Sequence, residues 1–227
     1  METQKIYNLV ILDASGSMET IYTQALTGVN ETLATIRMAQ EKHPELQQYV
    51  TLASFSAGEN FLNRIYSAQP IAEARNITSK DYPLLGCTAL YDAMGTCISE
   101  LQQKVTHGDR ALVTIITDGY ENASRTWSSH QIKSLVQELR KMGWTFTYIG
   151  ADQDVEKVAE EIGVQNSLRF SANAEETEAM FNKERYSRNR FYCKVCNSLS
   201  SPYNSMIESN DYFADDDEPE ANPFGKK

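Results

Sequence analysis

The residues best suited to chemistry in this 227-residue sequence are oxygen-bearing side chains in three short segments. Asp13, Ser15 and Ser17 lie in the segment DASGSM, Thr88 lies in GCTA, and Asp118 lies in TDGY. Together they offer two carboxylates and three hydroxyls. Hard oxygen ligands of this kind favour Mg²⁺ or Mn²⁺ over softer metals. The sequence therefore predicts an oxygen-lined site for Mg²⁺ or Mn²⁺.

The charge balance of such a site indicates what else it would bind. If the hydroxyls of Ser15, Ser17 and Thr88 coordinate as neutral ligands, a dication faces only the carboxylates of Asp13 and Asp118. The ion then keeps much of its electrophilicity and an unfilled octahedral position. An anionic oxygen from another protein can fill that position. We therefore expect a protein partner that presents an Asp or a Glu.

Two of the three segments follow runs of strand length. Residues 7–12 (YNLVIL) and 111–117 (ALVTIIT) are continuous apolar or β-branched runs, which are typical of parallel strands buried on both faces. Asp13 and Asp118 come directly after these runs. In an open doubly wound sheet, ligands bind beyond the carboxyl ends of the strands, where the winding direction reverses. The predicted ion site lies at that position.

The rest of the sequence alternates between helical and strand patterns. This alternation predicts an α/β fold with a doubly wound, mostly parallel six-stranded sheet, one antiparallel edge strand, and helices on both faces. The further expected strands are residues 49–55 and 61–66, which form a hairpin, then 145–149 and 168–170; the expected helices lie around residues 26–36, 90–105, 132–142, 155–162 and 175–190.

The three segments together resemble one family. DASGS matches the D-x-S-x-S signature of the von Willebrand factor A (vWA) family, whose metal-ion-dependent adhesion site also uses a Thr and a later Asp that Thr88 and Asp118 match. The resemblance covers roughly residues 4–185, and TDGYENAS is similar to bacterial and phage intracellular members. It implies that Ser15, Ser17 and Thr88 contact the ion, with Asp13 and Asp118 acting mostly through water. Cys87 stands where Gly is commoner in the family.

Domain organisation follows from composition. Residues 1–197 are predicted to form one vWA-type domain that includes the last helix. Residues 198–227 lack periodicity and are rich in Ser, Asn, Pro and acidic residues, so an acidic, disordered tail is expected. Its acidic residues are Glu208, Asp211, Asp215, Asp216, Asp217, Glu218 and Glu220.

The charge distribution bears on partners. A net charge of −10 repels phosphate backbones, so no nucleic-acid partner is expected. A basic run precedes the acidic tail. An alternative function is therefore a metal-independent scaffold that binds through its tail or its last helix. The basic run consists of Lys183, Arg185, Arg188, Arg190 and Lys194.

The first residues lack the features of a secretory signal, and no stretch approaches the roughly 20 apolar residues of a membrane span. A cytoplasmic protein with reduced thiols and no membrane partner is therefore expected. Cys193 and Cys196 form a CxxC motif, but a zinc site needs two further ligands. Because Cys87 and Cys97 are expected to lie far away, the pair is interpreted as inert thiols or as half of a truncated metal knuckle. His43, His107 and His130 are assigned to surface or capping roles.

An enzymatic alternative is a magnesium-dependent phosphohydrolase of the haloacid dehalogenase type. That chemistry uses an Asp nucleophile after the first strand and a second Asp two residues later as general acid. Ser15 occupies the second position here, and no suitably placed Lys is evident. The sequence therefore favours a non-enzymatic protein.

Three other side chains lie close to the predicted site in sequence. Asp92 lies one helical turn beyond Thr88 and is expected to support the site or to cap the helix. Tyr120 and Trp127 follow Asp118 and are either contacts for a partner at the rim of the site or half-packed aromatics.

Overall fold

The computed structural model describes residues 3–151, 154–199 and 211–214. The chain begins with β1 (Gln4–Asp13), and its strands and helices alternate as the sequence pattern predicts. The further strands are β2 (Leu46–Phe55), β3 (Leu62–Pro70), β4 (Arg110–Thr117), β5 (Trp144–Ala151) and β6 (Asn166–Phe170). The α-helices are α1 (Tyr22–Lys42), α2 (Leu90–Gln102), α3 (Ser129–Lys141), α4 (Val155–Glu161) and α5 (Ala174–Leu199), with 3-10 helices η1 (Gly16–Ile21) and η2 (Ile71–Glu73).

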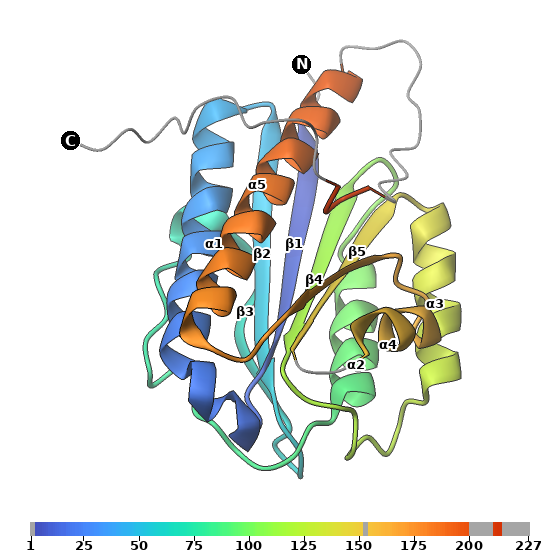
Figure 1. Ribbon diagram of the computed structural model, residues 1–227. Helices are drawn as coiled ribbons and strands as arrows, with labels where there is room; N and C mark the ends of the chain where they lie inside the picture. The colour runs from blue at the N-terminus through green and yellow to red at the C-terminus, as the bar shows by residue number, and fades with distance from the viewer. Residues whose placement is uncertain (1–2, 152–153, 200–210, 215–227) are drawn as a thin grey trace, which may run out of the picture.

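The strands form one six-stranded sheet in the order β3-β2-β1-β4-β5-β6 (Figure 1). All neighbouring strands are parallel except β2 and β3, which pair antiparallel and place β3 at one edge. The predicted sheet is therefore confirmed, including its antiparallel edge strand. The chain leaves β1 toward β2 first and reaches β4 on the other side of β1 later, so the winding direction reverses between β1 and β4.

Helices cover both faces of the sheet (Figure 1). Helices α1 and α5 pack on one face, and α2, α3 and α4 pack on the other. Strand β1 shows why both faces need cover: Ile6 and Val10 face the α1 side, whereas Leu9 and Ile11 face the α2 side, and all four are buried. Successive side chains of a strand point to opposite faces, so a continuous apolar run makes a central strand buried on both sides.

Two glycines directly follow helices that end where the sequence pattern predicts helix ends. Gly143 and Gly163 have φ of 88° and 75°, and each follows the end of a helix, α3 and α4 respectively. This left-handed backbone is costly for other residues, so glycine is preferred there. Helix α2 ends at Gln102, earlier than its apolar stripe indicates, so Val105 lies outside it.

The packed part of the chain extends past residue 197. Helix α5 continues to Leu199, and Asp211 to Ala214 form a turn in which the Tyr212 side chain is only 2% exposed. Tyr212 lies in the core cluster between the sheet and helices α1 and α5. The remainder of the predicted tail, residues 200–210 and 215–227, lies outside the described residues. Among the described residues, no helix is both long and apolar enough to cross a membrane.

Candidate metal centre

Asp13 is the innermost residue of the predicted site. It is the last residue of β1, and β4 runs parallel beside it, so that Thr117 ends at the same edge of the sheet. The Asp13 side chain is 0% exposed, and both of its oxygens accept hydrogen bonds. The Ser15 backbone N–H donates to Oδ1 at 2.7 Å, and the Thr117 hydroxyl donates to Oδ2 at 2.6 Å.

The electrostatics of Asp13 are unfavourable for a carboxylate in the metal-free protein. Burial raises the pKa of Asp13 to about 6, although the hydrogen bonds from Thr117 and Ser15 act in the opposite direction. The charge of the nearby Asp118 contributes a small part of this rise. No Lys, Arg or His of the described residues forms an ion pair with Asp13. A buried anion without a cationic partner is costly, and a bound cation would remove that cost.

Three more predicted residues, Ser15, Ser17 and Asp118, are joined to one another by short oxygen–oxygen contacts. The hydroxyl oxygens of Ser15 and Ser17 lie 3.1 Å apart, and the Ser17 hydroxyl donates to Asp118 Oδ1 at 2.7 Å. Ser15 is buried, Asp118 is half-buried and Ser17 is exposed. The row of oxygens therefore leads from the buried Asp13 outward to solvent.

Thr88 reaches the site from a separate loop. The Gly16 N–H donates to the Gly86 carbonyl at 3.1 Å, and the Leu85 N–H donates to the Ala14 carbonyl at 2.7 Å. These bonds hold the Thr88 loop against the Asp13 turn. Thr88 is 3% exposed, and its hydroxyl forms no hydrogen bond to any described residue. The residue as a whole is buried, but its hydroxyl oxygen is not one of the fully buried atoms that lack a partner, so a ligand in the site can reach it.

Gly119 shows that oxygens from three segments face one small space. A Cβ added at Gly119 would lie 3.2 Å from Thr88 Oγ1, 3.6 Å from Ser17 Oγ and 3.9 Å from Asp13 Oδ2. Adjacent ligands of an octahedral Mg²⁺ at 2.0–2.1 Å lie about 3.0 Å apart. The oxygen–oxygen separations of 3.1 Å and 2.7 Å at Ser17 are close to that value. The donor set and its spacing therefore fit Mg²⁺ or Mn²⁺, with Asp13, Ser15, Ser17, Thr88 and Asp118 as the residues that would hold it.

The loop after β4 is fixed by two acidic residues rather than by secondary structure. The Asp92 carboxylate accepts hydrogen bonds from the backbone N–H groups of Arg125, Thr126 and Trp127 at 2.8–2.9 Å. Glu121 accepts from three groups of the same loop and from the Tyr91 N–H of α2. Asp92 therefore positions a loop near the site, which is a role that its sequence context only partly indicated, and nothing in the sequence pattern pointed to Glu121.

Asn122 and Tyr82 are further positioning residues that the sequence did not reveal. The Asn122 side chain accepts from the Thr88 N–H at 3.0 Å, and the Asn122 N–H donates to the Thr88 carbonyl at 3.1 Å. The Tyr82 hydroxyl donates to the Asp13 carbonyl at 2.5 Å. These contacts join segments 34 and 69 residues apart, so periodicity could not have found them.

The two aromatics near the site differ in their surroundings. Trp127 is half-buried and packs against Gly95 of α2, where an added Cβ would overlap its ring. Tyr120 is 57% exposed and stands at the rim of the site, next to Gly119. Of the two, only Tyr120 is therefore available for contact with a partner. Cys87 is exposed, while its neighbour Thr88 is buried.

The basic run of α5 is largely used inside the molecule. Arg188 is 0% exposed and pairs with Glu184 at 2.7 Å. Arg190 donates to three carbonyls of residues 211–214, and Lys194 pairs with Asp211 at 2.8 Å. The run is therefore not a free cationic surface, which weakens the case for a scaffold that binds through the last helix.

Comparison with known proteins identifies the fold. No family model matches the sequence, and no curated protein matches it. Solved structures with a similar fold include the SpRpn10 VWA domain, at 10% identity and a TM-score of 0.52 over 78% of this chain and 94% of that one. The ArnB paralog VWA2 from Sulfolobus acidocaldarius has 15% identity and a TM-score of 0.51 over 81% of this chain and 46% of that one.

A pilus adhesin has a higher TM-score. SpaC from Lactobacillus rhamnosus GG, in the open conformation, has 15% identity and a TM-score of 0.63 over 85% of this chain. This chain spans 31% of SpaC, and it spans 64% of the PilB minor pilin from Streptococcus sanguinis. At these identities the comparisons show a vWA-like fold, which this chain shares with vWA domains, a pilus adhesin and a minor pilin.

Proposed function

We propose that this protein is a non-enzymatic interaction module that binds Mg²⁺ at the carboxyl ends of β1 and β4 and uses the ion to hold a carboxylate of a protein partner. The observation that supports this most is the buried Asp13, which has no ion pair with a described Lys, Arg or His and is surrounded by oxygens of Ser15, Ser17, Thr88 and Asp118. Such an anion is destabilising unless a cation occupies the site. Mn²⁺ fits the same oxygen ligands.

In this proposal the ion acts as a Lewis acid that attracts an anionic oxygen. The protein's own residues neutralise its charge but leave part of its coordination open. The hydroxyls of Ser15, Ser17 and Thr88 are neutral, so the carboxylates of Asp13 and Asp118 just balance the dication. Ser17 is exposed at the outer end of the oxygen row. A partner carboxylate can therefore approach from solvent on the Ser17 side.

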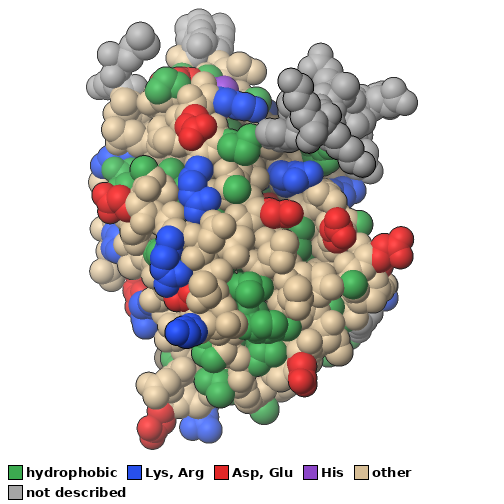
Figure 2. Space-filling model, turned by 90° about the vertical axis from the view of Figure 1, so that its left-hand side faces the viewer, with side chains coloured by type: hydrophobic (Ala, Val, Ile, Leu, Met, Phe, Trp, Pro, Cys, Tyr) green, Lys and Arg blue, Asp and Glu red, His purple; other side chains and the backbone are tan. Residues whose placement is uncertain are grey.

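The rim of the site offers apolar contact area for such a partner. Leu85 is 58% exposed and Tyr120 is 57% exposed, and both are adjacent in sequence to residues that position the site. Figure 2 shows a face on which hydrophobic side chains gather toward the lower end of the molecule, the end at which β1 terminates in Figure 1. Buried apolar contact combined with one charged anchor is typical of binding hot spots.

The phosphohydrolase alternative has less support. Both Asp13 oxygens accept hydrogen bonds inside the protein, and the side chain is 0% exposed, so it is poorly placed to attack a substrate. The residue two positions on is Ser15, which cannot serve as a general acid in the way a carboxylic acid does.

Metal binding is tested by calorimetric titration of the purified chain with Mg²⁺, and by electron paramagnetic resonance with Mn²⁺. We expect one ion per chain in the wild type and at least about a tenfold loss of affinity in Asp118→Asn. Asp109→Asn is the matched control, because Asp109 precedes β4 just as Asp118 follows it. Equal affinity in the wild type and Asp118→Asn would contradict the proposal.

Partner binding is tested by capture from a cell extract on immobilised protein, with Mg²⁺ or with chelator, followed by mass spectrometry. A protein retained by the wild type and by Asp109→Asn in Mg²⁺, but lost in chelator and in Asp118→Asn, is the expected result. Retention that is the same in chelator would instead favour metal-independent binding.

A further inference from the structure

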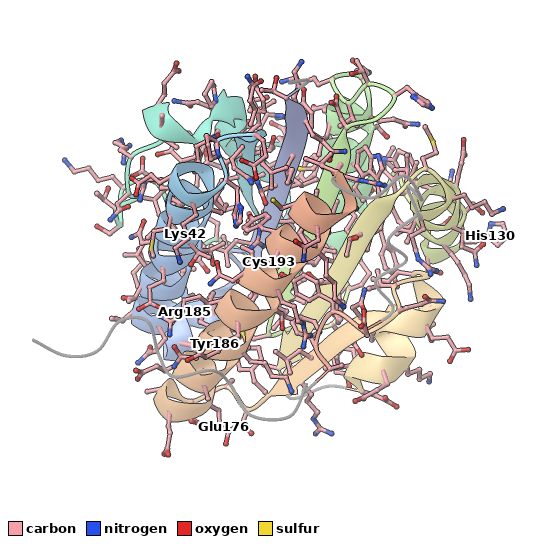
Figure 3. The ribbon with its side chains drawn as sticks, turned by 90° about the horizontal axis from the view of Figure 1, so that it is seen from above. Lys42, His130, Glu176, Arg185, Tyr186 and Cys193 are labelled. Atoms are coloured by element: carbon pink, nitrogen blue, oxygen red, sulfur yellow. The ribbon has the colours of Figure 1, made fainter. Side chains whose placement is uncertain are left out.

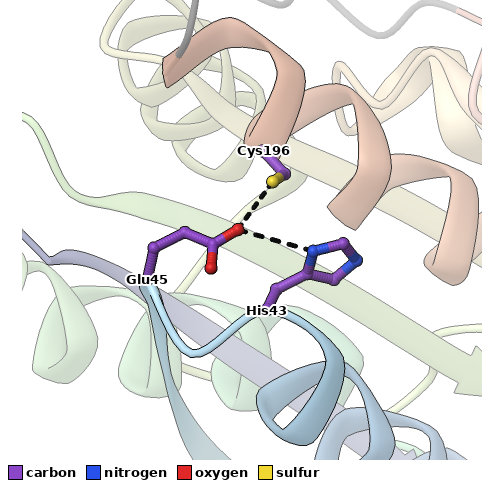
Figure 4. A group of neighbouring side chains, drawn as sticks. All are labelled: His43, Glu45 and Cys196. Carbon is purple, nitrogen blue, oxygen red and sulfur yellow. Dashed lines mark hydrogen bonds and ion pairs between the residues drawn. The ribbon is translucent and has the colours of Figure 1, made fainter.

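A second group of side chains of the types that bind metals lies at the opposite end of the strands. His43 follows the last residue of α1, Glu45 precedes β2, and Cys196 lies on the last turns of α5. One ligand atom from each, an imidazole nitrogen, a carboxylate oxygen and a thiol sulfur, lie within 4.8 Å of one another (Figure 4). All three residues are half-buried. The group lies near the amino end of β1, whereas Asp13 lies at the carboxyl end of that strand (Figure 1).

Glu45 is the centre of this group. The Cys196 thiol donates to Glu45 Oε1 at 2.7 Å, and His43 Nδ1 lies 3.5 Å from the same oxygen (Figure 4). The hydrogen bond to Glu45, together with burial, raises the pKa of the Cys196 thiol to about 11. Because a thiolate and a carboxylate repel each other at this distance, a proton has to lie between them. A divalent cation can take the place of that proton, since metal binding deprotonates cysteine.

We propose that His43, Glu45 and Cys196 bind a divalent transition metal, with Zn²⁺ as the expected ion and Cys193 as the fourth ligand. Imidazole, carboxylate and thiolate are the ligands that Zn²⁺ uses in proteins. The thiolate excludes Mg²⁺, which prefers oxygen. This site is therefore chemically distinct from the oxygen-lined centre at Asp13.

The observed separations require little movement. Ligand lengths of about 2.3 Å for sulfur and about 2.0–2.2 Å for nitrogen and oxygen place tetrahedral ligand atoms roughly 3.3–3.8 Å apart. The nitrogen–oxygen distance of 3.5 Å already lies in that range. The sulfur–oxygen distance of 2.7 Å has to lengthen by about 1 Å, which a rotation of the exposed part of the Glu45 or Cys196 side chain provides.

Cys193 is the candidate fourth ligand because of its position on α5. It lies three residues before Cys196, so the two side chains are neighbours on the helix surface. Its charge contributes to the raised pKa of Cys196, which is consistent with this proximity. Cys193 is exposed and therefore free to change rotamer. Seen from above, it lies on α5 beside the end of α1 that carries Lys42, the residue before His43 (Figure 3).

The two further ligands that the CxxC motif lacks in the sequence are thus supplied by the turn between α1 and β2. Cys97 lies in the core on the other face of the sheet, whereas His43 and Glu45 lie beside Cys196. An ion at this place would join the end of α5 to the turn before β2. Residues 151 positions apart would then be held by metal–ligand bonds.

The site is tested with Co²⁺ as a spectroscopic probe of the reduced, full-length chain in excess Mg²⁺, so that the oxygen-lined centre is filled. We expect a thiolate-to-cobalt charge-transfer absorption that saturates at one ion per chain and is displaced by Zn²⁺. Cys196→Ser should abolish it, and His43→Gln should weaken Co²⁺ affinity by at least about 100-fold. Cys87→Ser, which removes an exposed thiol elsewhere, and Asp118→Asn should leave it unchanged.

Circular dichroism of each variant without metal serves as the fold control. Cys193→Ser should roughly halve the charge-transfer intensity, since one of two thiolates is lost; full intensity would overturn the assignment of Cys193 as a ligand. A charge-transfer band that survives in Cys196→Ser, or that disappears in Cys87→Ser, would overturn the site. So would a folded, fully reduced wild type without any such band at Co²⁺ concentrations well above the protein concentration.

Discussion

Two buried polar clusters in this protein share the same sheet but differ in their charge balance. At the carboxyl end of β1, Asp13 is 0% exposed and receives only neutral hydrogen-bond donors. In the middle of the same strand, Asn8 belongs to a cluster in which the Arg188 guanidinium is paired with Glu184 at 2.7 Å. The first cluster lacks a cation from the described residues, and the second contains its own.

The Arg188 cluster is almost fully satisfied. Arg188 donates to Glu184, Asn8 and Thr114, and Tyr192 donates to Asn8 at 2.6 Å. Burial is the largest single influence and lowers the pKa of Arg188, but the charges of Glu184, Tyr192 and Tyr212 and the hydrogen bond to Glu184 together outweigh it, so the pKa lies well above its ordinary value. Two buried atoms of this cluster and its neighbour Gln48, which accepts from Asn8, have no partner among the described residues: Glu184 Oε2 and Gln48 Nε2.

The comparison separates a structural role from a binding role. Arg188 and Glu184 neutralise each other, so their cluster fixes α5 on the sheet and needs nothing from outside. In the proposed function the Asp13 cluster is completed by a cation, which the oxygens around it would hold. An uncompensated buried charge is tolerated where function requires it, and it lowers the stability of the unligated protein.

The largest expected effect is at the Arg188 cluster. Arg188→Met leaves Glu184 as a buried, unpaired anion, and we expect a loss of about 3–5 kcal/mol in the free energy of unfolding. Urea denaturation measures it. Arg185→Met is the matched control on the same helix, with a change within about 0.5 kcal/mol. A loss below about 1 kcal/mol in Arg188→Met would mean that the pair contributes little and that the contrast between the clusters is not one of charge balance.

At Asp13 we expect a substitution to increase the free energy of unfolding instead of lowering it. In the metal-free protein, Asp13→Asn removes a buried charge, and Asn can still accept from the Ser15 N–H. The Thr117 hydroxyl can turn to donate to the Gly119 carbonyl, 3.2 Å away. The raised pKa sets an upper limit of about 3 kcal/mol on the gain in stability at pH 8.

Chemical denaturation in chelator measures that gain, and repetition with Mg²⁺ should reverse it, because only the wild type binds the ion. The gain should also fade as the pH is lowered from 6 to 4. The folded-state pKa of about 6 lies above the unfolded value of 3.8, so the wild type recovers this stability on protonation and loses it as the pH rises through 6. A destabilised Asp13→Asn protein in chelator at pH 8 would show that Asp13 is satisfied without a cation.

The next largest effect is expected on Mg²⁺ affinity, which should fall when the pH is lowered. A metal ligand must be deprotonated to bind, so Mg²⁺ affinity should be constant from pH 7 to 8 and fall by up to about tenfold per unit below the Asp13 pKa of about 6. Calorimetric titration over this range measures it. A constant affinity down to pH 5 would indicate that Asp13 stays ionised without the metal, as it would if an internal cation compensated it.

The smallest expected effect comes from Gly119→Ala. The new methyl group would lie 3.2 Å from Thr88 Oγ1, in the space that the site oxygens face, so Mg²⁺ affinity should fall by about tenfold while stability changes by less than about 1 kcal/mol. Gly16→Ala is the matched control, since its added Cβ meets only the Gly86 carbonyl at 3.8 Å. Equal losses of affinity in the two variants would point to a general distortion of the turn.

The sequence alone determined the sheet and the approximate membership of the oxygen-rich site. Strands β1 and β4 are continuous apolar runs, and Asp13 and Asp118 follow them directly, so a local pattern places both residues at one edge. The helix ends at Gly143 and Gly163 follow from backbone preference. Each of these features depends on residues close together in the chain.

Only the tertiary structure decided which side chains compensate one another. Arg188 reaches Asn8 across 180 residues, Asp92 holds a loop 33 to 35 residues away, and Cys196 meets Glu45 across 151 residues. In the sequence, Arg188 is one member of a basic run and His43 is a helix-end histidine. Periodicity reports which face of an element is apolar, whereas the partner of a buried charge is set by which elements the fold brings into contact.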